Sequence, residues 1–295
     1  MRTMDETAAA ILAPPKGLLV VDEYAEALVG TDRAHRFTES VLRTEGLSDY
    51  VSAVLLTPEA FAALRPNGLR PLIGVRMTTQ EIPLGHLAGR GASFVEWREN
   101  LSPLDVPLGS VHISAETLAR GAAAAQAAGI LPILTIAMPE LGASSITITQ
   151  AVTTNALLAL RTELDRAGVD PRHLLVRINM VVPGLTNPVP ADSQQVARLT
   201  TALLDKGIPA QTPGVLLLSG GQPLDQACSH LEAIASDPGH SWRVTYGFSR
   251  PLVASAAEAW VRTEDAAESG RILLQNCRRA SESVAAALAA GGARS

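Results

Sequence analysis

The chain has very little lysine. Only Lys16 and Lys206 are lysines, and the other 22 basic residues are arginines. An amine can lose its proton and attack a carbonyl, so lysine is the residue that forms imines with substrates. A guanidinium stays protonated at biological pH and cannot supply that nucleophile. The sequence therefore offers only two side chains for imine chemistry, and their positions decide whether they can take part.

Cysteines and long apolar runs are scarce as well. Cys228 and Cys277 are far apart and in no metal-binding spacing, which favours a reduced protein. No apolar run approaches the roughly 18 residues of a membrane-spanning helix, so we expect no membrane partner. The first seven residues, Met-Arg-Thr-Met-Asp-Glu-Thr, lack the basic-then-apolar plan of a signal peptide. These absences together predict a cytoplasmic protein.

Excess positive charge is also missing. The net charge is −5 and the sequence pI is about 5.7, whereas a nucleic-acid binder usually carries a basic domain. The six histidines show no paired spacing of the kind that metal ligands have. We therefore expect no nucleic-acid partner, no metal and no cofactor.

The apolar residues that are present form eight short runs separated by longer helical patterns. Strands buried on both faces read as such continuous runs, and eight alternating β-then-α units predict an α/β fold, a (β/α)₈ barrel. With 295 residues the chain has room for one such barrel, residues 1–295, as a single domain. The predicted strands are Gly17–Asp22, Tyr50–Leu56, Arg70–Arg76, Ser93–Arg98, Ile130–Ala137, Leu174–Met180, Gly214–Leu218 and Val244–Ser249.

Helices are expected between the strands and at the start of the chain. Residues 1–14 are predicted to contain an N-terminal helix, and the Ala/Gly-rich tail, 285–295, is predicted to be frayed. Asp192 or Ser193 is a candidate N-cap, and Gly129 a candidate C-cap. The predicted connecting helices include Ser114–Ala128, Thr149–Ala167, Ser193–Lys206, Leu224–Ser236 and Ala254–Thr263.

Charged residues stand at the carboxyl ends of five predicted strands, the end at which such barrels place their active sites. They are Asp22, Arg76, Glu96, Arg98, Arg177 and Arg250. Glu96 and Arg98 are two positions apart and so point to the same side of their strand. Because charges inside apolar strands are costly unless paired, these residues indicate a shared charged cavity. The alternative is a salt-bridge network that only closes the end of the barrel.

Two loops add groups suited to an anion. Ser219, Gly220 and Gly221 follow the seventh predicted strand, and two glycines let backbone N–H groups approach an oxyanion closely. Ser249 and Arg250 follow the eighth, where the guanidinium can bind an oxyanion with two hydrogen bonds. The loops after these two strands are the usual phosphate site of such barrels. We predict that these residues bind the phosphate or carboxylate of a small anionic metabolite.

Several stretches resemble class I fructose-bisphosphate aldolases. Pro15–Glu23 is similar to the family's first strand, whose active-site aspartate falls on Asp22. Phe94–Arg98 is similar to the family's Phe-Ala-Lys-Trp-Arg, and Arg98 falls on a phosphate or substrate contact. Asn179–Gly184 and Leu218–Gln222 match closely, and Arg250 falls on the family's phosphate-binding arginine. The family is commonly tetrameric, so the resemblance makes a homo-oligomer one expectation, although no interface can be read here.

This chain differs from the family at the positions that hold the family's catalytic residues. By the resemblance, Arg177 stands where the family has its Schiff-base lysine, while Glu96 and Arg76 replace two further lysines. Thr135 and Ala137 stand where it has two glutamates, one of them the main proton-transfer group. Lys16 precedes the first predicted strand and Lys206 precedes the seventh, so both are expected at the opposite end of the barrel. We therefore expect no Schiff base.

Three functions remain open. The first is a lyase or isomerase that acts on a phosphorylated or otherwise anionic sugar or keto compound by non-covalent acid–base and electrostatic catalysis. Asp22 and Glu96 would then serve as base and acid, and Arg177 and Arg76 would stabilise an enolate. Alternatively, Glu96 only pairs with Arg177. The second function is an inactive relative that retains phosphate-ligand binding as a sensor or partner protein, and the third is a true fructose-bisphosphate aldolase, which we favour least.

Overall fold

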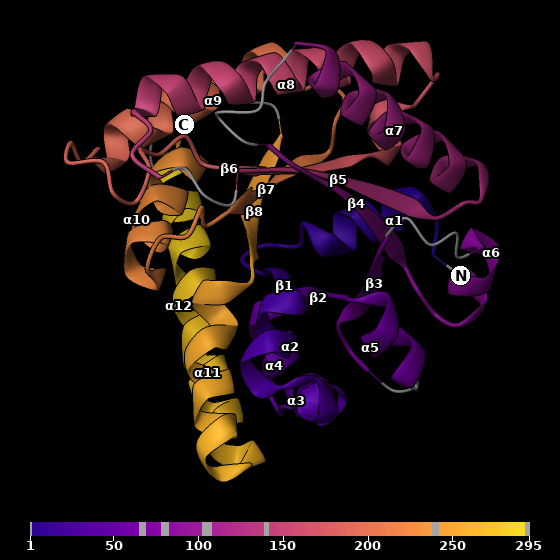
Figure 1. The fold of residues 1–295 in the computed structure, drawn as a ribbon, viewed down its shortest axis with the longest axis vertical. Coiled ribbons are helices and arrows are strands. Elements are labelled where there is room, and N and C mark those ends of the chain that lie inside the picture. Colours follow the sequence, from indigo (N-terminus) through magenta and orange to yellow (C-terminus); the bar gives the residue numbers. More distant parts are fainter. Residues whose placement is uncertain are drawn as a thin grey trace.

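Eight parallel strands close into a barrel in a computed structural model (Figure 1) that describes residues 2–64, 69–77, 83–101, 108–138, 142–237 and 242–292. Each strand pairs with its neighbours in the chain, and β1 closes the ring against β8 with Leu18 opposite Gly247. The predicted fold class is confirmed, and each strand lies within two residues of its predicted bounds. The strands are β1 (Gly17–Val21), β2 (Val51–Leu56), β3 (Leu72–Arg76), β4 (Phe94–Asn100), β5 (Leu131–Ala137), β6 (Leu175–Asn179), β7 (Gly214–Leu218) and β8 (Arg243–Phe248).

Helices surround the barrel, and α11 and α12 run side by side as a long pair. The Asp192 side chain caps α9 by accepting a 2.7 Å hydrogen bond from Gln195 N, and Gly129 takes a left-handed conformation after α7, as predicted. The helices are α1 (Met4–Ile11), α2 (Glu23–Val29), α3 (Thr31–Leu42), α4 (Leu47–Tyr50), α5 (Pro58–Ala63), α6 (Leu84–Gly89), α7 (Leu108–Ala127), α8 (Ile146–Arg166), the 3₁₀ turn η1 (Pro171–His173), α9 (Ser193–Gly207), α10 (Leu224–Ala235), α11 (Arg250–Thr263) and α12 (Ala266–Gly292).

Two predictions about helix ends need correction. The tail 285–295 was expected to be frayed, but α12 continues to Gly292 and buries Ala287, with only the last three residues outside the described part. The last helix before it was expected from Ala254, but α11 begins at Arg250 because Pro251 fits the first turn of a helix. The earlier start places Arg250 at the positive end of a helix. In the described ranges, no helix is both long and apolar enough to cross a bilayer.

Alternation along each strand divides the barrel interior into two layers. Leu18 and Val20 of β1 pack in one apolar cluster with Phe94 of β4 and Leu175 of β6. Ile11 of α1 belongs to the same cluster, so α1 closes the amino end of the barrel. Further along the strands the inward positions change character and become polar or charged. They include Asp22 after β1, Arg76 of β3, Glu96 and Arg98 of β4, Thr135 of β5, and Arg177 and Asn179 of β6.

The apolar layer depends on a glycine for space. A Cβ atom at Gly74 in β3 would lie 2.1 Å from the Phe94 ring, far inside contact distance. Phe94 is fully buried and fills the barrel interior from the next strand. Because protein cores are packed as densely as organic crystals, the ring has no free volume into which to move.

We therefore expect Gly74→Ala to destabilise the barrel by roughly 1–3 kcal/mol, the usual cost of overpacking a core. The matched control is Gly85→Ala in α6, where a Cβ would meet no atom within 4 Å. That change should leave stability unchanged or slightly raised, since alanine favours helix over glycine. Urea unfolding followed by circular dichroism measures both variants, and equal stabilities for the two would contradict this account of Gly74.

Candidate functional site

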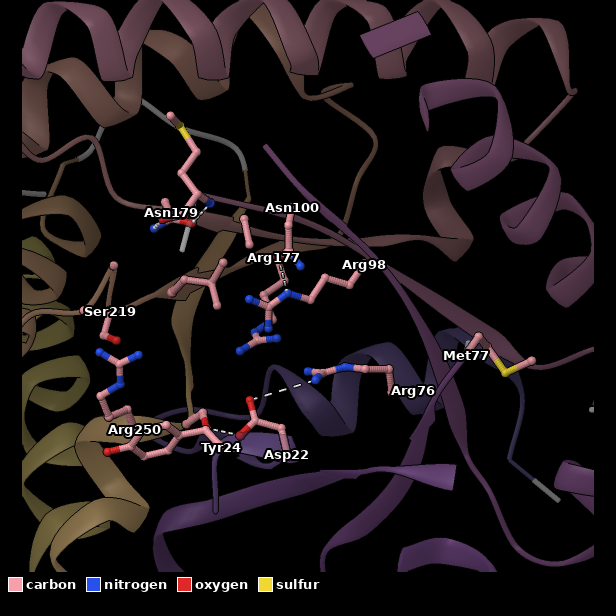
Figure 2. A pocket seen from close by; sticks show the side chains of 16 residues that line it. Asp22, Tyr24, Arg76, Met77, Arg98, Asn100, Arg177, Asn179, Ser219 and Arg250 are labelled. Carbon is pink, nitrogen blue, oxygen red and sulfur yellow. Dashed lines mark hydrogen bonds and ion pairs between the residues drawn. The ribbon is translucent and has the colours of Figure 1, made fainter. Parts of the chain in front are cut away.

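A cavity of about 400 Å³ opens at the carboxyl ends of the strands (Figure 2). The predicted site residues that line it are Asp22, Arg76, Arg98, Arg177, Ser219, Gly220, Gly221, Ser249 and Arg250. The tenth, Glu96, does not line the cavity and is fully buried. The loops after β7 and β8 therefore meet the charged strand ends in one space.

The Glu96 carboxylate is the centre of an ion-pair network. Its Oε2 accepts a 2.7 Å hydrogen bond from Arg76 Nε, and its Oε1 accepts one of 2.7 Å from Arg177 Nη1. Thr135 Oγ1 donates to the same Oε1 at 2.5 Å. Side chains from β3, β5 and β6 thus converge on one carboxylate from β4. This geometry supports the alternative in which Glu96 is a salt-bridge partner.

The network keeps its members charged. Burial alone would raise the pKa of Glu96, but the positive charges of Arg76 and Arg177 and the Thr135 hydrogen bond outweigh it and lower that pKa to about 2. Burial lowers the pKa of Arg177 to about 10, although the nearby Glu96 carboxylate opposes the change. At neutral pH Glu96 is therefore an anion and Arg177 a cation. An anionic Glu96 has no proton to donate, so it is poorly suited to the role of general acid.

Arg177 lies at the floor of the cavity, against Gly247 of β8. Its Nε donates a 3.0 Å hydrogen bond to Gly247 O, and a Cβ on Gly247 would lie 2.9 Å from that nitrogen. The Arg177 side chain is 1% exposed. Within the described part of the chain, its Nη2 takes part in no hydrogen bond. One nitrogen of this guanidinium, Nη2, is therefore left as a donor to the cavity.

Asp22 is the carboxylate that reaches the cavity from β1. Its Oδ1 accepts a 2.8 Å hydrogen bond from Ser249 Oγ, and its Oδ2 lies 3.9 Å from Arg76 Nη1. Figure 2 shows Asp22 below the guanidiniums and pointing toward Arg76. Ser249 was predicted to bind an anion, but its hydroxyl hydrogen is directed to Asp22. It therefore orients the carboxylate.

The expected anion loop has a backbone that only glycine adopts easily. Gly220 and Gly221 have φ angles of 62° and 81°, in the left-handed region. A Cβ on Gly221 would lie 3.9 Å from Arg250 Nη1, so the loop and this guanidinium are neighbours. The Arg250 guanidinium also stacks over the Tyr24 ring, with Cζ 4.8 Å from its centroid. Backbone N–H groups, a fixed guanidinium and the start of α11 together suit a phosphate.

Sequence reasoning missed three polar residues that line the cavity. Tyr24 lies two positions beyond Asp22, and Asn179 lies two positions beyond Arg177 on the same face of β6. Asn100 follows Arg98 in the same way and accepts a 2.8 Å hydrogen bond from its Nε. Alternation along each strand was the signal that could have found Asn100 and Asn179. The stacking of Arg250 on Tyr24 joins residues distant in sequence and had no such signal.

Both lysines lie away from the cavity, as the sequence predicted. Lys16 lies between α1 and β1, at the amino end of the barrel, and its Nζ donates a 2.6 Å hydrogen bond to Ser48 O. Lys206 lies in the last turn of α9, before β7. Neither residue lines the cavity. Among the described residues, no group of three or more His, Cys, Asp or Glu side chains is placed to hold a metal ion.

The network should make stability depend on pH through Glu96. Glu96→Gln removes the carboxylate that the buried Arg76 and Arg177 guanidiniums share. Breaking a buried ion pair typically costs about 3–5 kcal/mol, so we expect roughly that loss at pH 7. Since the folded pKa of about 2 lies below the ordinary 4.5, ionised Glu96 stabilises the fold above pH 4.5 and loses this effect as the pH falls toward 2. The gap between the variant and the natural protein should therefore narrow from pH 7 to pH 3, as measured by urea unfolding.

The control for this experiment is Glu39→Gln, which removes an exposed ion pair with Arg43. Such pairs contribute at most about 1 kcal/mol, so this variant should stay close to the natural protein at both pH values. A Glu96→Gln protein as stable as the Glu39→Gln protein would contradict the proposed importance of the network.

The sequence is similar to known proteins that are named fructose-bisphosphate aldolases. A family model described as class-I fructose-bisphosphate aldolase matches residues 85–294. Fructose-bisphosphate aldolase 1 of Toxoplasma gondii is 28% identical over 322 residues, covering 94% of this chain and 88% of the relative. Fructose-bisphosphate aldolase B of Sparus aurata is 34% identical over 204 residues, which cover 66% of this chain and 56% of that protein.

A solved structure shares the fold. The fructose-bisphosphate aldolase of Plasmodium falciparum, crystallised with TRAP and a small-molecule inhibitor, superposes with a TM-score of 0.84 at 24% identity. The superposition covers 95% of this chain and 93% of that one. Because the family model matches well over half of its length, this chain belongs to the class I fructose-bisphosphate aldolase family.

Proposed function

We propose that the barrel binds a small phosphorylated or otherwise anionic sugar or keto compound and acts on it as a lyase or isomerase, without a lysine imine. The observation that carries this proposal is the buried Arg177 guanidinium on the cavity floor, held by Glu96 and Gly247. It supplies a fixed positive charge where, by the family resemblance, the imine-forming lysine would stand. A fixed charge aimed at a developing oxyanion is a large source of catalysis in its own right.

Phosphate binding is supported by the loops after β7 and β8. Gly220 and Gly221 line the cavity with a left-handed backbone, and Arg250 lies beside them at the start of α11. Helix N-termini and glycine loops favour oxyanions because the N–H groups there have no helical partner. The relatives are named fructose-bisphosphate aldolases, after a phosphorylated sugar. A phosphorylated compound is therefore the ligand class that we propose.

The chemistry that we propose is proton abstraction next to a carbonyl. Asp22 takes the proton from the carbon beside the carbonyl, and the electron pair moves onto the carbonyl oxygen to give an enolate. Arg177 and Arg76 stabilise the enolate charge. The Ser249 hydroxyl and Arg76 orient the Asp22 carboxylate for this step. Isomerisation passes through such an enolate. In carbon–carbon cleavage the base instead takes the proton of the β-hydroxyl group, a carbonyl forms there, and the electron pair of the broken carbon–carbon bond gives the same enolate.

A second candidate is a relative that binds the same ligand without turnover. The burial of Glu96 favours it, because its carboxylate is committed to two arginines. Thr135 and Ala137 bring no carboxylate from β5 either. Asp22 is then the one acidic group that lines the cavity among the described residues. This candidate differs from the first only in whether Asp22 performs acid–base chemistry.

We expect borohydride treatment with dihydroxyacetone phosphate to leave the protein unmodified, since no amine reaches the cavity floor. Intact-mass spectrometry measures the outcome. The matched positive control is a class I aldolase treated in parallel, in which the imine is trapped as a stable adduct. A reduced adduct on Lys16 or Lys206 would overturn the proposed mechanism.

The two candidate functions can be distinguished by measuring binding and turnover of phosphorylated sugars and keto compounds in the natural protein and in the variants Asp22→Asn and Arg250→Gln. Asp22→Asn should bind the ligand but lose about 10²–10⁴-fold in turnover, the usual contribution of a general base. Arg250→Gln should weaken binding, and Arg262→Gln, an exposed site on the same helix, should change neither property. Turnover that survives in Asp22→Asn would exclude Asp22 as the base. Binding without turnover in the natural protein would favour the second candidate.

A further inference from the structure

The arginines of the cavity are held in two different ways. Arg76 and Arg177 pair with the buried Glu96 carboxylate, which balances part of their positive charge. The Arg250 side chain forms neither a hydrogen bond nor an ion pair with the part of the chain that the structure describes. Its guanidinium instead lies over the Tyr24 ring, with Cζ 4.8 Å from the ring centroid. The guanidinium of the proposed phosphate site is therefore held by an aromatic ring.

A ring can hold a guanidinium without using its hydrogen-bond donors. The negative face of the ring attracts the cation, while the N–H groups lie along the edge of the guanidinium plane. A carboxylate in the same place would accept two of those N–H groups and cancel the charge, and an incoming phosphate would have to displace it. The Tyr24 ring leaves both the donors and the charge of Arg250 for a ligand. Stacking therefore suits an arginine that must bind an oxyanion and release it again.

The loop after β7 offers further donors beside this guanidinium. A Cβ on Gly221 would lie 3.9 Å from Arg250 Nη1. In the described part of the chain, the amides of Gly220 and Gly221 donate no hydrogen bond to a protein acceptor. Gln222 holds the turn, because its Nε2 donates a 2.6 Å hydrogen bond to Ser219 O. A phosphate bound at Arg250 therefore has backbone donors next to the guanidinium.

Two contacts join the residues that follow β1 to those that follow β8, at the place where these strands close the barrel. Asp22 accepts a 2.8 Å hydrogen bond from Ser249 Oγ, and Tyr24, two residues later, lies against Arg250. Figure 2 shows Tyr24 between the labelled side chains of Asp22 and Arg250. Each contact orients one group. The Ser249 hydroxyl orients the proposed base, and the Tyr24 ring orients the guanidinium of the proposed phosphate site.

We propose that Tyr24 is a positioning residue, whose ring holds the Arg250 guanidinium beside the Ser219–Gly221 loop in the orientation that binds the phosphate of the ligand. This inference rests on the proposed function, which places a phosphate at Arg250. It adds that the affinity for phosphate depends on an aromatic ring at position 24. The Tyr24 hydroxyl has no part in this role, since it forms no hydrogen bond with the described residues.

The test measures the affinity for glycerol 3-phosphate, a phosphate monoester without a carbonyl group, by isothermal titration calorimetry. We expect Tyr24→Leu to weaken binding roughly twofold to thirtyfold, the equivalent of a cation–π interaction of about 0.5–2 kcal/mol. Tyr24→Phe keeps the ring and should bind the probe as tightly as the natural protein does. Tyr24→Met also removes the ring and should resemble Tyr24→Leu, so it replaces that variant if Tyr24→Leu fails to fold.

The matched control is Tyr50→Leu. Tyr50 is half-buried against the same apolar core as Tyr24, but it belongs to α4 and does not line the cavity. Its replacement should lower stability in urea unfolding without changing the affinity for glycerol 3-phosphate. A double-mutant cycle then separates positioning from packing. In the Arg250→Gln background, Tyr24→Leu should cause no further loss of affinity, because the guanidinium that the ring holds is absent.

The outcomes distinguish this inference from the proposed function. Unchanged affinity in both Tyr24→Leu and Tyr24→Met would overturn the role of Tyr24 and leave the phosphate site intact. A loss in Tyr24→Phe as large as that in Tyr24→Leu would assign the effect to the hydroxyl, and an undiminished effect of Tyr24→Leu in the Arg250→Gln background would show that the ring acts without the guanidinium. Either result would also overturn it. A natural protein that does not bind glycerol 3-phosphate would contradict the proposed function, and this inference with it.

Discussion

The buried Glu96 carboxylate, shared between Arg76 and Arg177, is the interaction on which the cavity depends. Without it, two guanidiniums would repel each other in a region where burial already disfavours their charge. With it, both are held at fixed positions, and Asp22 is drawn toward Arg76 on the far side. Glu96 therefore influences the ligand through other side chains without lining the cavity. The same group links β3, β4, β5 and β6, so the charge pattern of the site and the closure of the barrel are coupled.

Along β1, β3, β4 and β6, the inward positions are apolar near the amino end of the barrel and charged or polar near the carboxyl end. Leu175 and Arg177 are two residues apart on the same face of β6, yet one packs in the floor cluster and the other faces the cavity. Phe94 and Glu96 of β4 repeat the change. An apolar floor closed by α1 excludes water from beneath the network. The ion pairs there are consequently stronger than they would be at a surface.

The sequence predicted the barrel and most of the site because both leave local patterns. Apolar runs marked all eight strands, and nearly all of the charged residues at the strand ends proved to line one cavity. What could not be predicted depended on side-chain direction across the barrel. The choice between acid and ion-pair partner for Glu96 required the positions of Arg76 and Arg177. The direction of the Ser249 hydroxyl toward Asp22, and the stacking of Arg250 on Tyr24, likewise join residues that are remote in sequence or lie in different turns.

The residue at position 247 of β8 determines how large a side chain can be placed at position 177 of β6. Its bare backbone accepts the Arg177 Nε hydrogen bond, and any larger residue would occupy the space of that nitrogen. The side chain at position 247 thus limits the space for the side chain at position 177, although the two positions are 70 residues apart in the chain. For protein engineering, this means that a library that varies the cavity floor must sample β6 and β8 together. If only one of these strands is varied, the only substitutions tolerated are those that fit the unchanged residues of the other.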